Sequence, residues 1–233
     1  GPIAWPLQER DRLSLEEMEL MLNRLERETF KQDHARLMRS AAAGRSLGGI
    51  LNSRDPRRAL AVYDRSLLRL GEIKNNTKAR RGEAGLLAGS SFALRRLGRA
   101  PEARERIEKA LNLLRETKDY PAEKIGLGGE ADYVQRAWAG YLAESGQQQR
   151  AVEVYRELLD KILASSPDPE HDLNHAAQLS ELYGSFAGAL RRGGQTAEAG
   201  TISERRLKLW RLWRDKLPKN AFIARQLAAA SKS

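Results

Sequence analysis

Apolar residues recur at intervals of three and four positions along most of the chain, which is the spacing of one face of an α-helix. The stretch from Gly98 to Leu114 is a clear example, with apolar positions at Ala103, Ile107, Ala110, Leu111 and Leu114. Gly98 suits the end of a preceding helix, and Pro101 suits the first turn of the next one. Alternating apolar and polar runs bounded by hairpin turns, the pattern of β-strands, do not occur in the sequence. The chain is therefore predicted to be all-α.

This helical pattern is repeated four times. In each copy a small residue opens the second of two predicted helices, and these residues are Ala59, Ala103, Ala151 and Ala199. They are 44, 48 and 48 residues apart, and the hexapeptides ALRRLG (93–98) and ALRRGG (189–194) lie 96 residues apart, twice the longer step. A single helical hairpin cannot bury its apolar face alone, so neighbouring hairpins are expected to stack. The predicted hairpins span about residues 33–74, 77–116, 129–165 and 170–217.

The two ends of the chain are predicted to differ from the repeats. Residues 1–12 are expected to hold a protease-cleavage scar and a linker. Residues 13–32 are predicted to form an amphipathic helix, because Ser14 and Glu17 make a capping-box pattern before an apolar stripe. We expect this helix to cover the open end of the stack; a homodimer joined through it is the alternative. Residues 218–233 are predicted to form a capping helix and a tail.

A small residue late in the first helix, a glycine at the turn and an alanine five residues later resemble the tetratricopeptide repeat (TPR). The second copy carries this pattern at Leu87, Ser91, Leu94, Gly98, Ala103, Ile107 and Ala110. The third and fourth copies carry it at Gly146 with Ala151 and at Gly194 with Ala199, so the resemblance covers about residues 33–215. It implies a TPR-like right-handed superhelix of about four helical hairpins that binds a peptide or protein partner. Because the steps of 44–48 residues exceed the usual 34, we expect an irregular superhelix.

Three segments, 54–67, 156–176 and 209–227, also resemble the C-terminal repeat region of acidobacterial membrane-anchored serine/threonine kinases. This resemblance implies a regulatory or sensor region of a bacterial signalling protein, either cytoplasmic or in the extracytoplasmic part of a membrane-anchored protein. The sequence contains no run of 18 apolar residues, so we expect no membrane span in this chain. It also lacks a P-loop, a dinucleotide glycine fingerprint, a nucleophile elbow and the kinase catalytic signatures. We therefore expect no enzymatic activity and no cofactor.

The charge of the chain suggests which kind of partner it would bind. With 41 Lys and Arg against 31 Asp and Glu residues, the formal net charge is +10, which favours an acidic partner, although a basic soluble surface is the simpler explanation. In tetratricopeptide proteins the first helices of the hairpins line the binding groove. By this resemblance the candidate partner-binding residues are Arg95, Arg96, Tyr133, Arg136, Arg191 and Arg192. Arginines bind carboxylates or phosphates in bidentate fashion, but contact with the last carbonyls of a helix would also explain the two arginine pairs.

Two other classes of function stay open on the sequence. The positive charge is compatible with a nucleic-acid or anionic-ligand binding helical domain, but acidic residues are mixed with the basic ones, so nucleic acid is the less expected partner. His171 and His175 would share one face of a helix and form a weak candidate for zinc or nickel in a small helical metalloenzyme. A metal site usually needs a third protein ligand, so we expect none. The alternative is a helix start, with Asp168 as N-cap and Pro169 as first residue.

Overall fold

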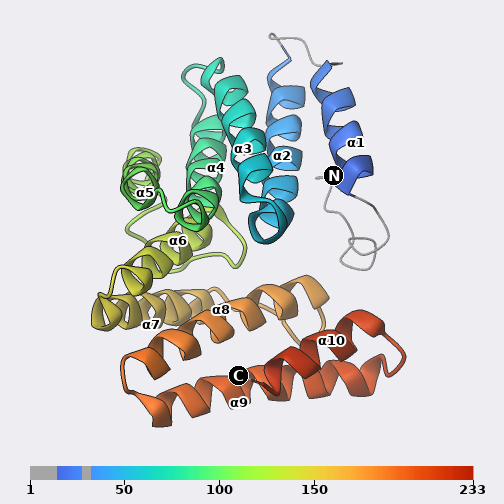
Figure 1. Ribbon diagram of the computed structural model, residues 1–233, viewed down its shortest axis with the longest axis vertical. Coiled ribbons are helices and arrows are strands. Elements are labelled where there is room, and N and C mark those ends of the chain that lie inside the picture. The colour runs from blue at the N-terminus through green and yellow to red at the C-terminus, as the bar shows by residue number, and fades with distance from the viewer. Residues whose placement is uncertain (1–14, 28–32, 233) are drawn as a thin grey trace. The chain divides into compact units, whose positions relative to one another are not determined.

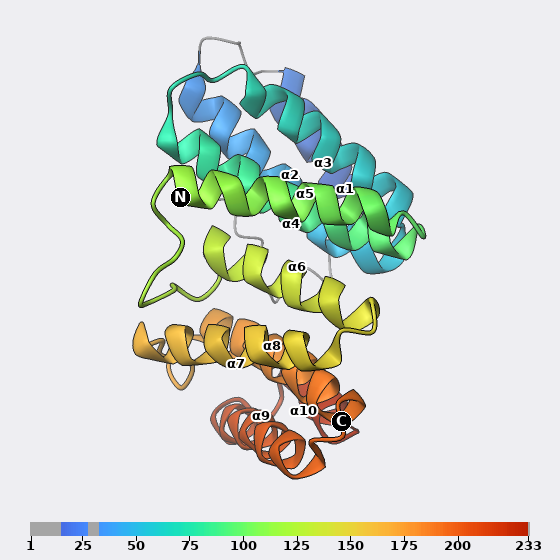
Figure 2. The same ribbon diagram turned by 90° about the vertical axis from the view of Figure 1, so that its left-hand side faces the viewer.

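The computed structural model describes residues 15–27 and 33–232, and in these ranges it contains ten α-helices and no strand. The prediction of an all-α protein is therefore confirmed. The chain divides into two compact units, residues 1–121 and 122–233. Within the described residues, each unit contains two helical hairpins and one further helix (Figure 1, Figure 2).

The first unit begins with the additional helix and continues with the two hairpins. Its helices are α1 (Leu15–Arg27), α2 (His34–Arg54), α3 (Pro56–Gly71), α4 (Thr77–Arg96) and α5 (Ala100–Glu116). The hairpins are α2 with α3 and α4 with α5, and α4 also packs against α2 and α3, so that α1 to α4 lie side by side in Figure 1. A single residue, Asp55, separates α2 from α3, and its side chain accepts the N–H of Arg58 at 3.1 Å. This carboxylate satisfies one of the free N–H groups in the first turn of α3.

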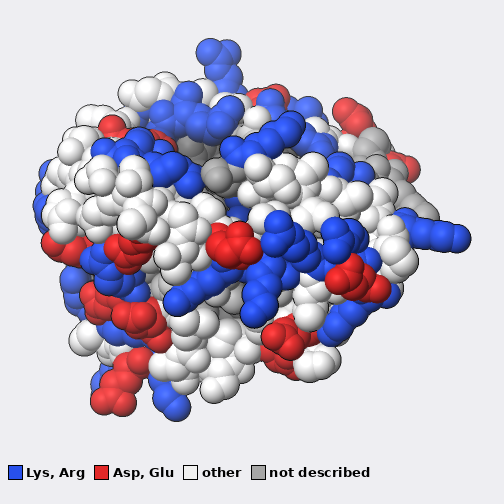
Figure 3. Space-filling model, turned by 90° about the horizontal axis from the view of Figure 1, so that it is seen from below, with Lys and Arg blue, Asp and Glu red and all other residues white. Residues whose placement is uncertain are grey.

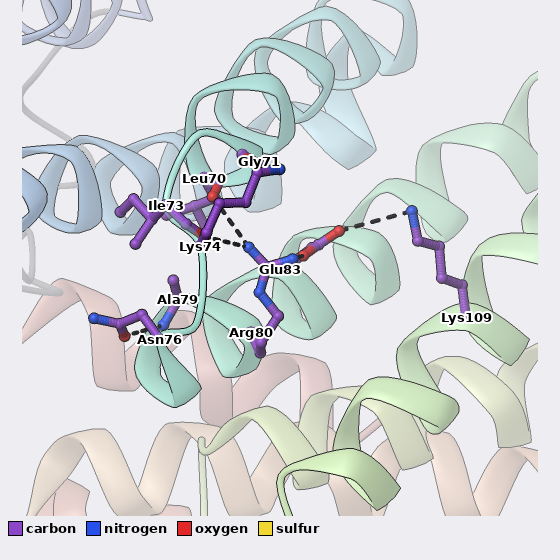
Figure 4. A network of polar contacts seen from close by, with 9 residues as sticks. All are labelled: Leu70, Gly71, Ile73, Lys74, Asn76, Ala79, Arg80, Glu83 and Lys109. Atoms are coloured by element: carbon purple, nitrogen blue, oxygen red, sulfur yellow. Dashed lines mark hydrogen bonds and ion pairs between the residues drawn. The ribbon is translucent and has the colours of Figure 1, made fainter. Parts of the chain in front are cut away.

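The turn between α3 and α4 is held by Arg80, which lies in the first turn of α4 (Figure 4). Its guanidinium donates to the carbonyls of Leu70 and Ile73, at 3.3 and 2.7 Å. The same group forms an ion pair with Glu83 at 2.5 Å, and Glu83 also faces Lys109 on α5, with 3.7 Å between Oε1 and Nζ. Carbonyls at a helix C-terminus lack intrahelical partners, so Arg80 supplies donors that α3 itself cannot.

The core of the first unit is built around Tyr63, a fully buried residue of α3. Its ring lies against Gly48 of α2 and Gly89 of α4: a Cβ at either glycine would come within 2.5 or 2.6 Å of a ring carbon. The hydroxyl accepts a hydrogen bond from Nδ2 of Asn52 at 3.1 Å. Gly48 and Gly89 are therefore needed here for the close packing of the first helices against Tyr63.

The second unit has two hairpins followed by the additional helix. Its helices are α6 (Glu130–Glu144), α7 (Gln148–Ala164), α8 (Leu173–Arg192), α9 (Thr196–Lys216) and α10 (Ala221–Ala230). The hairpins are α6 with α7 and α8 with α9, while α10 packs on α9, with the Phe222 ring edge-on to Trp210 at 5.9 Å between centroids. The turn glycines Gly146 and Gly194 have φ of +79° and +78°, the left-handed conformation that ends many helices at glycine. Gly98 does the same in the first unit, with φ +74°.

The prediction that Asp168 caps the first helix of the fourth hairpin is wrong. The side chain of Asp172 accepts the N–H groups of Asn174 and His175, at 2.7 and 3.1 Å, and α8 begins at Leu173. The Oδ1 atom of Asp168 lies 2.8 Å from the ring of His171 instead. Two aspartates four residues apart both fit a capping pattern, and Asp172 is the one that caps α8.

Candidate partner-binding surface

The candidate residues of the first unit lie at the C-terminal end of α4. Arg95 and Arg96 are the last two residues of this helix. The guanidinium carbon of Arg95 lies 4.7 Å from the centroid of the Phe92 ring, a cation–π contact one turn back along the helix. Arg96 is exposed. The phenylalanine face therefore orients one arginine of this pair.

In the second unit, Arg136 of α6 is a structural residue. Its Nε lies 2.6 Å from Oδ1 of Asp132, which is only 1% exposed, and its Nη1 donates to the carbonyl of Gln178 on α8 at 3.0 Å. Burial alone would lower the pKa of Arg136, but the Asp132 carboxylate outweighs it and raises the pKa above its usual value. The same carboxylate accepts the N–H of Gly128 at 2.8 Å. Because the donors of Arg136 are occupied inside the unit, we leave it and the adjoining Tyr133 out of the candidate surface.

The other arginine pair, Arg191 and Arg192, ends α8 and is exposed. Arg191 donates from Nη1 to Oγ of Ser203 on α9, at 3.2 Å. Nη1 of Arg192 turns back toward Gly188, where a Cβ would lie 3.5 Å from it. The side chain of Arg191 therefore reaches α9, and that of Arg192 lies beside Gly188.

Two further arginines, Arg205 and Arg206 of α9, belong to the same region, and the sequence reasoning missed them. Arg206 is half-buried: its Nε donates to Oγ of Ser180 at 3.0 Å, and its Nη1 would lie 2.9 Å from a Cβ at Gly184. Arg205 is exposed. The resemblance to tetratricopeptide proteins predicts binding residues only on the first helix of each hairpin, whereas these two arginines lie on a second helix. The sequence did contain a signal that distinguishes Arg206 from its counterparts. Arg206 lies seven residues after Ala199, the small residue that opens the second helix of its copy.

The other copies fill that seventh position with small or apolar buried residues. They are Ser66, Ala110 and Leu158. An arginine at a position that normally packs against the first helix needs space and hydrogen-bond acceptors there. Gly184 provides the space, and the hydroxyl of Ser180 provides an acceptor. We call Arg191, Arg192, Arg205 and Arg206 the α8–α9 arginine surface.

Within this surface, the charges of Arg191 and Arg206 act on one another. Burial lowers the pKa of Arg206; the carboxylate of Glu181 opposes the shift, and the positive charge of Arg191 adds to it. Burial raises the pKa of Tyr183, and the charge of Arg205 opposes that change. Like charges held close together create a positive potential that attracts anions.

The charge around this surface is strongly unbalanced. Residues 191–225 contain ten Lys and Arg but only three Asp and Glu. Each of these three acids takes part in an ion pair: Glu198 with Arg156 at 2.8 Å, Glu204 with Arg211 at 3.2 Å, and Asp215 with Arg214 at 2.8 Å. Figure 3 views the molecule from the α9 side, where Lys and Arg side chains outnumber Asp and Glu.

The histidines of the candidate metal site stabilise the loop before α8. Nδ1 of His171 contacts Asp168, and Nδ1 of His175 accepts the backbone N–H of Asp168 at 3.1 Å. Within residues 15–27 and 33–232, no three His, Asp or Glu side chains are grouped so that they could hold a metal ion. The sequence contains no cysteine to supply another ligand.

No protein-family model, curated protein or solved structure matches the chain. None of the helices in the described part of the chain is long and apolar enough to cross a membrane. The feature of this chain that bears most directly on its function is therefore the α8–α9 arginine surface.

Proposed function

We propose that this chain is a non-catalytic protein-interaction scaffold that binds an acidic peptide or an acidic surface of a partner protein. In this proposal its hairpins stack as a TPR-like superhelix. The observation that carries the proposal is the α8–α9 arginine surface, which draws four arginines from the two helices of one hairpin, two of them, Arg206 and Arg192, beside Gly184 and Gly188 of α8.

Three features suit this surface to carboxylates. Guanidinium groups bind carboxylates in a planar, bidentate geometry, which an ammonium group cannot provide. Arg206 is already oriented by Ser180, so less side-chain entropy is lost when it binds. Gly184 and Gly188 leave room for the guanidinium groups of Arg206 and Arg192 beside α8.

The same proposal includes a cellular role. The three segments that resemble the C-terminal repeat region of acidobacterial serine/threonine kinases support a regulatory or sensor region of a bacterial signalling protein. A scaffold with a basic binding surface would bring an acidic protein to such a signalling protein without taking part in phosphoryl transfer.

A nucleic-acid or anionic-polymer binding domain is the second candidate. It is favoured by one observation: residues 191–225 contain ten basic and three acidic residues, and therefore contribute +7 of the formal net charge of +10. Polyanion binding depends on total charge and weakens steeply with salt, whereas carboxylate recognition depends on where the arginines are placed.

The test compares two variants of equal net charge by fluorescence anisotropy at 50 and 200 mM NaCl. The probes are a fluorescein-labelled octaglutamate peptide and labelled single-stranded (dT)20. Arg191→Glu/Arg205→Glu reverses two charges of the surface, and Arg57→Glu/Lys78→Glu reverses two exposed charges near helix N-termini in the first unit, where acids are tolerated.

We expect at least a tenfold loss of peptide affinity in the first variant and less than a twofold loss in the control. Equal losses in both variants would show that only the total charge matters and would overturn the proposal. Tighter binding of (dT)20 than of the peptide, with a logarithmic salt slope of several units, would favour the nucleic-acid candidate.

A further inference from the structure

Helix α8 exposes a stripe of side chains whose two ends have opposite charges. Glu181, Ser185, Gly188 and Arg192 are spaced by four, three and four residues, which places them along one side of the helix. Gly188 is half-buried and the other three are exposed. At a rise of about 1.5 Å per residue, Glu181 and Arg192 lie about 17 Å apart along the axis. We call these four residues the α8 stripe.

The basic end of the α8 stripe is not paired with an acid. The guanidinium of Arg192 lies back along the helix, with Nη1 3.5 Å from the place of a Cβ at Gly188. Arg191, the next residue, donates to the hydroxyl of Ser203 and not to a carboxylate. Within residues 15–27 and 33–232, neither arginine forms an ion pair with an acidic side chain. This end therefore offers two guanidinium groups to an anionic ligand.

At the other end of the α8 stripe, Glu181 reduces the positive charge. Arg206 of α9 contacts this part of α8, since its Nε donates to Ser180 and its Nη1 lies beside Gly184. Burial lowers the pKa of Arg206, and the carboxylate of Glu181 acts against burial. The attraction between these opposite charges partly cancels the potential that Arg206 presents to an anion.

The carboxylate of Glu181 is accessible from solvent. Its side chain is exposed, and among the described residues it forms no hydrogen bond and no ion pair. It acts at longer range on Arg206 and Arg136, and Arg136 is already bound by Asp132 at 2.6 Å. A ligand carboxylate placed beside Glu181 would therefore be repelled, whereas a ligand ammonium or guanidinium group would be attracted.

We propose that Glu181 determines the charge pattern of the partner: acidic side chains bind beside Arg191 and Arg192, and a lysine or arginine of the same segment faces Glu181. The inference rests on the proposed function, because it takes an acidic segment to bind the α8–α9 arginine surface. An extended chain advances about 3.4 Å per residue, so about five residues separate the acidic and basic parts of the segment. The partner segment is therefore not uniformly acidic.

The selectivity that Glu181 gives is expected to be moderate. Each charge pair on this surface is exposed, and exposed pairs are individually weak. A segment with the correct pattern gains an attraction at Glu181, whereas a uniformly acidic segment suffers a repulsion there, so the two effects add in the comparison between ligands. We expect a difference in affinity of threefold to tenfold.

The first experiment compares two fluorescein-labelled peptides of equal composition and net charge by fluorescence anisotropy at 50 mM NaCl. In EEEEGGKK the centres of the acidic and basic blocks are five residues apart, and in EKGEEKGE the same residues are mixed. The unmodified chain should bind the first peptide at least threefold more tightly, and Glu181→Gln should reduce this preference to less than 1.5-fold. Equal affinities in the unmodified chain, or a preference that persists in Glu181→Gln, overturns the inference.

The second experiment uses the octaglutamate probe under the same conditions. Glu181→Gln should bind it at least threefold more tightly than the unmodified chain does, because a repelling carboxylate is removed. Asp160→Asn is the matched control: it also removes one negative charge from an exposed helical residue of the same unit, and it should change the affinity less than 1.5-fold. Equal gains in the two variants would show that only net charge matters and would overturn the inference.

The proposed function and the role of Glu181 are tested separately. If Arg191→Glu/Arg205→Glu loses octaglutamate affinity while Glu181→Gln gains no more than its control, the arginine surface binds acids and only the role of Glu181 is refuted. If the double variant loses no more affinity than its own control of equal net charge, or if none of the peptides binds, the proposed function is wrong and the inference is overturned with it.

Discussion

At the scale of single residues, arginine has two different roles in this protein. Arg136 is largely buried beside Asp132, with 14% of its side chain exposed, and joins α6 to α8, whereas Arg191, Arg192 and Arg205 are exposed. Burying a charge is costly unless a partner compensates it, so the first role needs an aspartate within hydrogen-bond distance. The role proposed for the exposed arginines, the binding of an acidic partner, needs an environment with few acidic residues. Both roles follow from the neighbours of each arginine.

The buried pair gives a prediction about stability. Asp132→Ala leaves the guanidinium of Arg136 buried without its counter-charge, and we expect a loss of about 3–5 kcal/mol in the free energy of unfolding of the second unit. Urea denaturation followed by tryptophan fluorescence measures it. Glu204→Ala is the control, because Glu204 forms an ion pair with Arg211 in the same unit but is 63% exposed, and it should cost no more than about 1 kcal/mol. Equal losses in the free energy of unfolding of the two variants would show that the Asp132–Arg136 pair stabilises the unit no more than an exposed ion pair does.

At the scale of secondary-structure elements, glycines determine how closely the helices approach. The ring of Tyr63 fits between α2 and α4 only because Gly48 and Gly89 have no Cβ. In the second unit, Gly184 makes the corresponding space for the guanidinium of Arg206. Each glycine costs roughly 1 kcal/mol of helix propensity relative to alanine. The packing of these two large side chains compensates for that cost.

Helix propensity and packing therefore predict opposite effects for glycine-to-alanine substitutions at two sites. Gly89→Ala places a methyl group against the Tyr63 ring and should lower the free energy of unfolding by about 1–3 kcal/mol. Gly200→Ala, in α9, has open space around its added methyl group and should raise it by about 0.4–1 kcal/mol. Thermal and urea unfolding followed by circular dichroism distinguish the two signs. A stabilising Gly89→Ala would contradict the close packing around Tyr63.

At the scale of the whole molecule, each of the two units has its own buried core. Tyr63, Leu86 and Leu94 belong to the core of the first unit, and Phe186 and Leu190 to that of the second. The candidate arginine pairs are divided in the same way, with Arg95 and Arg96 in one unit and Arg191 and Arg192 in the other.

This division predicts that different spectroscopic probes will detect different substitutions. Three of the four tryptophans, Trp138, Trp210 and Trp213, belong to the second unit. Asp132→Ala should therefore shift the urea midpoint measured by tryptophan fluorescence, whereas Gly89→Ala should shift the midpoint measured by circular dichroism and leave the fluorescence midpoint nearly unchanged. If both probes give the same midpoint in both variants, the chain unfolds as one cooperative unit and the prediction is wrong.

The sequence alone was enough to predict much of the fold. The all-α class, the hairpins and the glycine turns depend on short-range patterns: a period of three to four residues buries one face of a helix, and glycine reaches the left-handed conformation at its end. Local pattern was insufficient at the start of α8, where Asp168 and Asp172 both fit an N-cap, and only Asp172 is one.

The tertiary structure decided which polar side chains form the candidate site. In the sequence, Arg136 and Arg191 look alike, and Arg206 looks like an ordinary residue on a second helix. The donors of Arg136 are occupied because Asp132 and the carbonyl of Gln178 converge on it, and Arg206 lies beside α8 because Gly184 leaves room for it. These relations join residues far apart in the chain, and their energies depend on burial and on neighbouring charges. Helix periodicity contains no information about either, so only the folded arrangement distinguishes a structural arginine from one that is available to a partner.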